Sequence, residues 1–169
     1  MGSLRRTSLA PAGNTPLLRV RAKHRQKVSV VGALLRSVRS GRGQLVHETF
    51  VDRYVDDFFY AEFLQERVMR ATRRPVLLVQ DNAPLHRGPC TQEVIEDFYP
   101  RLTVYQFPAY APELNPMEQV WTWSKHHELA NFVPEDLDQL AIATEYAIET
   151  AEHDQQRLQS FFAAAKLPW

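Results

Sequence analysis

Two acidic residues, Asp81 and Glu118, lie where their carboxylates could bind a metal ion. Asp81 directly follows Pro75–Gln80 (PVLLVQ), a short and continuous apolar run. Such a run is typical of a strand that is buried on both faces, and ligands of open α/β sheets gather at the carboxyl ends of the strands. We therefore expect Asp81 at the ligand-binding edge of a sheet. The alternative is that Asp81 only caps a turn by accepting hydrogen bonds from backbone amides.

Glu118 is predicted in the first turn of a helix that begins at Pro116, after the next strand and a proline-rich loop. This position lets it reach the same sheet edge as Asp81. Mg²⁺ is usually held by one or two carboxylates together with water and phosphate oxygens, and paired ions stabilise the attacking and leaving oxygens of phosphoryl transfer. Asp81 and Glu118 are therefore candidate catalytic ligands of Mg²⁺ or Mn²⁺. The alternative for Glu118 is a favourable charge near a helix N-terminus, worth about 0.3–1 kcal/mol.

The elements around these acids indicate an α/β arrangement with a mixed sheet. Lys27–Leu35 and Gln44–Phe50 are rich in β-branched residues and are separated by glycines, which predicts a β-hairpin. The apolar spacing in Tyr54–Met69 predicts a helix that lies against a sheet. The other predicted elements are the strand Pro75–Gln80, a helix over Gln92–Phe98, the strand Leu102–Phe107, a helix from Pro116 capped by Asn115, a helix starting near Pro134 and a last helix over Leu158–Lys166.

Charge is distributed unevenly along the chain although the net charge is zero. Residues 1–47 contain ten Lys or Arg and no Asp or Glu, whereas residues 48–169 contain all twenty acids. In the first part, cations recur at every second residue, which would place them on one face of an extended strand. The alternative is a solvated strand with incidental charge. These five candidate DNA-binding residues are Arg19, Arg21, Lys23, Arg25 and Lys27.

Length and composition fit one globular domain. The 169 residues are 44% hydrophobic and 24% charged, which excludes disordered and collagen-like classes. We interpret residues 1–16 as an irregular lead-in and residues 17–169 as the domain. Because no apolar run is long enough for a membrane-spanning helix and no signal segment follows the basic N-terminus, we expect a cytoplasmic protein without a membrane partner. The single cysteine, Cys90, excludes an intrachain disulfide and a cysteine-based zinc cage.

Around the two acids the sequence resembles a known family. VLLVQDNAPLH, which contains Asp81, and TVYQFPAYAPELNPMEQVWTWSK, which contains Glu118, resemble the bacterial insertion-sequence branch of the mariner-like DDE transposases. The resemblance extends from about Thr15 to the C-terminus and includes VSVVGALL and SFFAAAKLPW. Two motifs in the family's order make it specific.

The resemblance implies a ribonuclease H-like fold in which Asp81 is the second and Glu118 the third metal-binding acid. It also implies the activity of DNA transposition, in which DNA strands are cleaved at transposon ends and transferred to a target. The remaining site residues that the match implies are Asn82, His86, Asn115 and Lys125.

The sequence departs from the family pattern at its start. Enzymes of this family carry their first catalytic Asp on a strand ahead of the hairpin, whereas this chain has no acid before Glu48. We therefore expect a chain that lacks this strand, a hairpin separated from the strand that ends at Asp81, and little or no nuclease activity of the isolated chain. The N-terminal segment or a partner chain, such as an upstream-frame product, could fill the gap.

Three functions remain open from the sequence. The first is the catalytic part of a DDE transposase, which would use Mg²⁺ or Mn²⁺ and bind transposon-end and target DNA, alone or as a homo-oligomer. The second is a non-catalytic DNA-binding or subunit-interaction fragment, which the missing acid favours. The third, a ribonuclease H-type hydrolase acting on RNA, keeps the metal chemistry but has no support from the motifs.

Overall fold

The strands of the protein form two separate pairs. The computed structural model describes residues 27–166, where β1 (Val28–Arg36) pairs antiparallel with β2 (Gly43–Val51). β3 (Val76–Gln80) pairs parallel with β4 (Leu102–Gln106). No strand pairing joins the two pairs within the described residues. The α/β class is thus confirmed, and so is the expected separation of the hairpin from the strand that ends at Asp81.

Helices and short helical turns connect and cover these strands. The connection from β2 to β3 contains one helical stretch. In it, α1 runs through the π-helical turn η1 (Leu64–Val68) into the short α2. The helical elements are α1 (Asp57–Phe63), η1 (Leu64–Val68), α2 (Met69–Ala71), η2 (Pro84–Arg87), α3 (Pro89–Asp97), η3 (Pro112–Leu114), α4 (Pro116–His126), α5 (Leu137–Glu152) and α6 (Gln155–Ala164).

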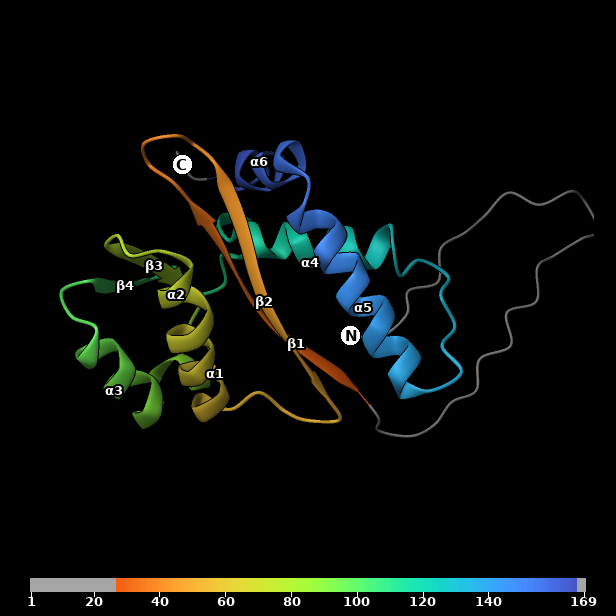
Figure 1. Ribbon diagram of the computed structural model, residues 1–169, viewed down its shortest axis with the longest axis horizontal. Coiled ribbons are helices and arrows are strands. Elements are labelled where there is room, and N and C mark those ends of the chain that lie inside the picture. Colours follow the sequence, from red (N-terminus) through yellow and green to blue (C-terminus); the bar gives the residue numbers. More distant parts are fainter. Residues whose placement is uncertain (1–26, 167–169) are drawn as a thin grey trace, which may run out of the picture.

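The hairpin lies between two groups of helices (Figure 1). Because successive side chains of a strand point to opposite faces, Leu34 and Leu45 pack in one core cluster with α4, α5 and α6. Ala33 and Val46 pack in a second cluster with α1 and η1. The same second cluster includes Val104 and other residues of β3 and β4. The α1–η1 helix therefore links the two strand pairs through apolar contacts, as expected for a helix that lies against a sheet.

The expectation that the strand ending at Asp81 is buried on both faces is wrong. Leu78 and Val104 face the second cluster, whereas Leu77 is 64% exposed and Tyr105 is 56% exposed. The physical reason is that β3 and β4 form only a two-stranded sheet, and the described elements pack on one of its faces. The apolar composition of the run therefore overstates its burial.

Several helices begin at other residues than the sequence predicts, because caps decide the first turn. The first helix begins at Asp57 rather than Tyr54, since Asp56 accepts a hydrogen bond from the Phe59 amide. The helix predicted from Gln92 begins at Pro89. The helix predicted from near Pro134 begins at Leu137, because Asp136 caps it, and α6 begins at Gln155, before the predicted Leu158. Within residues 27–166, no helix has the length and apolar character needed to cross a membrane.

Candidate metal and nucleic-acid site

Asp81 directly follows the last residue of β3 and keeps one carboxylate oxygen available. Its Oδ1 accepts a hydrogen bond from the Ala83 amide at 2.9 Å and lies 2.9 Å from Nδ1 of His86. Its Oδ2 has no hydrogen-bond or ion-pair partner among the described residues, and the side chain is 54% exposed. The turn-capping alternative is therefore correct for Oδ1, while Oδ2 can still bind a cation.

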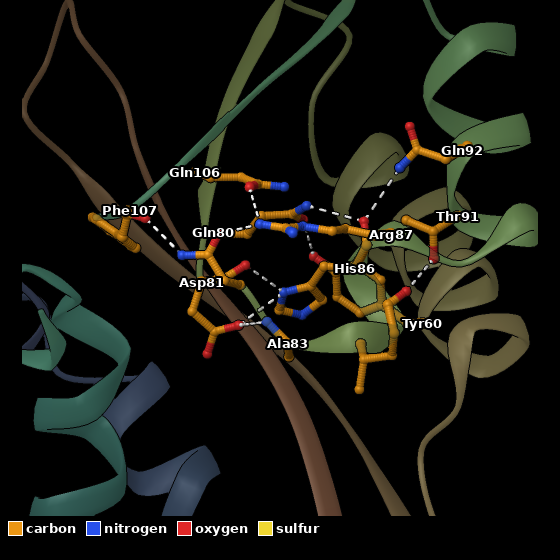
Figure 2. A network of polar contacts seen from close by, with 12 residues as sticks. Tyr60, Gln80, Asp81, Ala83, His86, Arg87, Thr91, Gln92, Gln106 and Phe107 are labelled. Carbon is orange, nitrogen blue, oxygen red and sulfur yellow. Dashed lines mark hydrogen bonds and ion pairs between the residues drawn. The ribbon is translucent and has the colours of Figure 1, made fainter. Parts of the chain in front are cut away.

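His86 is fixed against Asp81 and against the core (Figure 2). Its Nδ1 also lies 3.0 Å from the main-chain oxygen of Asp81, and its ring centroid lies 4.3 Å from that of Tyr60. The hydroxyl of Tyr60 donates to Oε1 of the buried Gln80 at 2.7 Å. Burial, and secondarily the negative charge of Asp81, raise the pKa of Tyr60 well above its ordinary value. Tyr60 therefore stays a protonated hydrogen-bond donor beneath His86.

A second set of contacts ties the ends of β3 and β4 together. Gln80 and Gln106 are partners in the strand register, and Arg87 Nη2 donates to Gln106 Oε1 at 2.7 Å. The same Nη2 donates to Oδ1 of Asn82, whose Nδ2 donates to the main-chain oxygen of Phe107 at 2.8 Å. Asn82 is thus fully engaged within the protein. These bonds hold the segment that carries Asp81 and His86 in one position.

Glu118 lies in the first turn of α4, as predicted. The side chain of Asn115 caps this helix by accepting a hydrogen bond from the Met117 amide at 3.0 Å. The helix lies close to β1: a Cβ added to Gly32 would be 2.9 Å from Met117 Cε and 3.0 Å from Trp121 Cη2. The loop before α4 is held from the other end of the chain, because the Lys166 amide donates to the Glu113 carbonyl at 3.0 Å.

The structure therefore groups the predicted site residues in two sets. Asp81, Asn82 and His86 share one contact network at the end of β3. Glu118 and Lys125 lie on α4, which packs on β1. The pairing of Asp81 with Glu118 across a shared cation stays a prediction. No group of three or more His, Cys, Asp or Glu side chains able to hold a metal occurs in the described part of the chain.

The free Oδ2 of Asp81 is a carboxylate oxygen, the kind of ligand that Mg²⁺ and Mn²⁺ favour. Mg²⁺ usually keeps several waters and takes only one or two carboxylates besides phosphate oxygens. The chemistry of Asp81 therefore suits an open metal site, and a contribution of Glu118 to the same site stays a prediction.

Of the five predicted DNA-binding cations, only Lys27 lies among the described residues. Its ammonium group is buried without a hydrogen-bond partner in the described part of the chain and lies over the ring of Tyr54. This placement engages Lys27 within the protein. The other four residues, Arg19, Arg21, Lys23 and Arg25, lie outside the described residues.

Sequence reasoning missed four residues that position the site, namely Tyr60, Gln80, Arg87 and Gln106. One signal could have identified two of them, because Gln80 and Gln106 are polar residues that end apolar strand segments. Arg87 offered no such signal, because its two acceptors come from separate segments.

The structure is that of an α/β protein with an acidic residue directly after a parallel strand and a second acidic residue in the first turn of a helix. The family model described as DDE superfamily endonuclease matches residues 2–141. The chain therefore belongs to this family.

Solved structures of the Mos1 mariner transposase share the fold. The Mos1 strand transfer complex aligns with a TM-score of 0.51 and 18% identity, covering 99% of this chain and 52% of that chain. The Mos1 mariner paired end complex with Mn aligns with a TM-score of 0.51 and 17% identity, covering 98% and 52%. This chain thus spans about half the length of the solved chains that it matches. A search of curated proteins found no match.

Proposed function

We propose that the chain is the catalytic part of a DDE transposase and acts in metal-dependent cleavage and transfer of DNA strands at transposon ends. The observation that carries this proposal is the free Oδ2 of Asp81 at the end of β3, in a chain that belongs to the DDE endonuclease family. The fold likeness to Mos1 complexes and the Mn in one of them support it. The function, substrates and partners of the whole protein are part of the proposal.

In this function Asp81 and Glu118 hold Mg²⁺ or Mn²⁺, and His86 keeps the Asp81 carboxylate oriented. When bound, the cation would stabilise charge on the attacking and leaving oxygens of the phosphodiester. Lys125 lies two turns after Glu118 on α4 and adds a positive charge on that helix. The network around Arg87 keeps the strand ends rigid, because phosphoryl transfer depends on placement of the reacting groups.

Metal binding tests the assignment directly. We expect Mn²⁺ to bind the 169-residue chain in the presence of duplex DNA, with affinity measured by the electron paramagnetic resonance signal of free Mn²⁺. Asp81→Asn and Glu118→Gln should each lower the affinity by about tenfold or more, because each removes a charged ligand. Asp81→Asn keeps an oxygen able to accept the Ala83 hydrogen bond, so the turn is retained. Glu113→Gln, an exposed loop acid near Glu118, is the matched control. Equal affinity in all variants would contradict the proposal.

A second candidate is a DNA-binding or subunit-interaction module without catalysis. The observation that favours it is the arrangement of the strands as two unjoined pairs in the described residues, because unpaired strand edges are templates for pairing with another chain. Nicking of supercoiled DNA in Mg²⁺ separates the two candidates. Nicking that Asp81→Asn abolishes supports the enzyme. DNA binding that needs no metal, in a chain whose Mn²⁺ affinity neither Asp81→Asn nor Glu118→Gln changes, supports the second candidate.

A further inference from the structure

An open hollow lies at the opposite end of β3 from Asp81. It has a volume of about 630 Å³ and is lined by Met69, Arg70, Arg73 and Arg101. The first three residues come from α2 and the segment that follows it, and Arg101 directly precedes β4. The hollow thus lies where α2 ends and the parallel strands begin. Three of its four lining side chains carry a permanent positive charge.

Arg101 is held rigidly in this hollow. Its Nη1 donates to the main-chain oxygens of Met69 at 3.2 Å and Thr72 at 2.9 Å. Its guanidinium carbon also lies 5.1 Å from the ring centroid of Phe98. Nη2 and Nε make no hydrogen bond or ion pair with other described residues. Because the guanidinium is already ordered, binding an anion there costs little side-chain entropy.

Arg70 and Arg73 are exposed and can turn toward an anion. Arg70 forms an ion pair with Glu66 at 2.8 Å, but an exposed pair of this kind contributes only about 0–1 kcal/mol. Arg73 has no ion-pair partner among the described residues. Arg70 could therefore exchange Glu66 for a phosphate without losing a strong internal contact.

All charged residues that line the hollow are positive. Residues 67–74 contain four arginines and no acid, and Glu66, the acid just before them, is already paired with Arg70. Arginine binds phosphate through two parallel hydrogen bonds from its planar group. The hollow is thus suited to a phosphate group by both charge and geometry.

We propose that this arginine hollow binds a backbone phosphate of DNA at a point away from the reacting phosphodiester. The proposal rests on the proposed DNA-directed function and adds a second contact surface to it. The seven residue steps from Arg74 to Asp81 span about 23 Å in an extended chain, so the hollow and the proposed metal site would contact different parts of a DNA. An open hollow admits a polymer that passes through it, which favours DNA over a small enclosed anion.

The test compares two charge-matched double variants. Arg70→Gln/Arg73→Gln removes two charges from the hollow, and Arg39→Gln/Arg42→Gln removes two exposed charges from the turn between β1 and β2. Affinity for a labelled random-sequence duplex is measured by fluorescence anisotropy over a salt series without metal. We expect the hollow variant to bind about tenfold more weakly, and the slope of log affinity against log salt to fall by about two, since each phosphate contact contributes about 0.9. The control variant should keep the slope of the unmodified chain.

Each outcome supports or overturns the proposal. An equal change in both double variants would show that affinity follows overall charge and would overturn it. An unmodified chain that binds no duplex would also overturn it. Inorganic phosphate at millimolar concentration should not displace the duplex; complete displacement would assign the hollow to free phosphate instead. The proposed function is tested separately, by Mn²⁺ binding that depends on Asp81. A negative result for duplex binding at the hollow therefore does not contradict Mn²⁺ binding, and the reverse also holds.

Discussion

Nδ1 of His86 lies within hydrogen-bond distance of both the carboxylate and the main-chain oxygen of Asp81, at 2.9 Å and 3.0 Å. One imidazole nitrogen thus contacts both the side-chain and the main-chain oxygen of the residue that directly follows β3. The opposite side of the ring is supported by Tyr60. His86 therefore orients the Asp81 side chain and acts as a positioning residue.

His86→Ala should weaken metal binding by about 10- to 100-fold, the usual effect of losing a residue that orients a ligand. Mn²⁺ titration of the folded chain measures this change. His153→Ala is the control, since among the described residues the imidazole of that histidine has a hydrogen-bond partner only in the Glu149 main-chain oxygen on α5, at 2.7 Å. The positioning role is wrong if His86→Ala and His153→Ala bind Mn²⁺ equally well.

Tyr60→Phe should lower the free energy of unfolding by about 1–3 kcal/mol, because it leaves the buried amide oxygen of Gln80 without its donor. Chemical denaturation at neutral pH measures the loss. Tyr146→Phe, at an exposed position, should change stability by less than about 0.5 kcal/mol. Equal stability of both variants would show that Gln80 finds another donor.

Stability should also fall with pH above about 10, the ordinary tyrosine pKa, because the raised pKa of Tyr60 keeps its proton on the folded state while the unfolded state releases it. The folded state then binds more protons, so the contribution of Tyr60 is complete below this pH and declines by up to about 1.4 kcal/mol per pH unit above it. Denaturation curves over alkaline pH should show a shallower decline for Tyr60→Phe than for Tyr146→Phe. Parallel declines would contradict the raised pKa.

Gly32→Ala should destabilise the protein by about 0.5–1 kcal/mol, since its Cβ would displace the flexible end of Met117 and crowd the ring of Trp121 on α4. A double-mutant cycle with Met117→Ala, measured by denaturation, tests the contact. We expect Gly32→Ala to cost less when Met117 is shortened, giving a coupling energy of at least about 0.5 kcal/mol. Additive effects of the two substitutions on stability would contradict a strained contact between position 32 and Met117.

Asn115→Ala should cost about 1 kcal/mol of stability through the lost cap and should also weaken Mn²⁺ binding, because the first turn of α4 carries Glu118. Asp136→Ala removes the corresponding cap of α5. We expect a similar stability loss there without any change in Mn²⁺ affinity. If both variants bind Mn²⁺ like the unmodified chain, the role of Glu118 in metal binding does not depend on the Asn115 cap of α4.

Local sequence signals predicted most of the elements that carry the candidate site. The β-branched runs predicted the hairpin, the run before Asp81 predicted β3, and Asn115 with Pro116 predicted the start of α4. These features depend on neighbouring residues, so propensity and capping suffice. The family resemblance supplied the expected roles of Asp81 and Glu118, which neighbouring residues alone leave open.

The rest depends on contacts between distant segments. The π turn Leu64–Val68 interrupts a regular apolar spacing without any glycine or proline to mark it. The bond from Arg87 to Gln106 requires the register of β3 and β4, which a single sequence does not reveal. Exposure of Leu77 depends on which elements cover the sheet. None of these could be inferred from residue type alone.

The bond between the Lys166 amide and the Glu113 carbonyl has a practical consequence for handling the protein. Removing the residues from Lys166 onward would delete the amide that holds the loop leading into α4, and a tag fused close to Lys166 would disturb this bond. A purification tag is better separated from Lys166 by a flexible spacer. Weak metal binding in a protein tagged closer to this bond would then reflect the tag rather than the chemistry of Glu118.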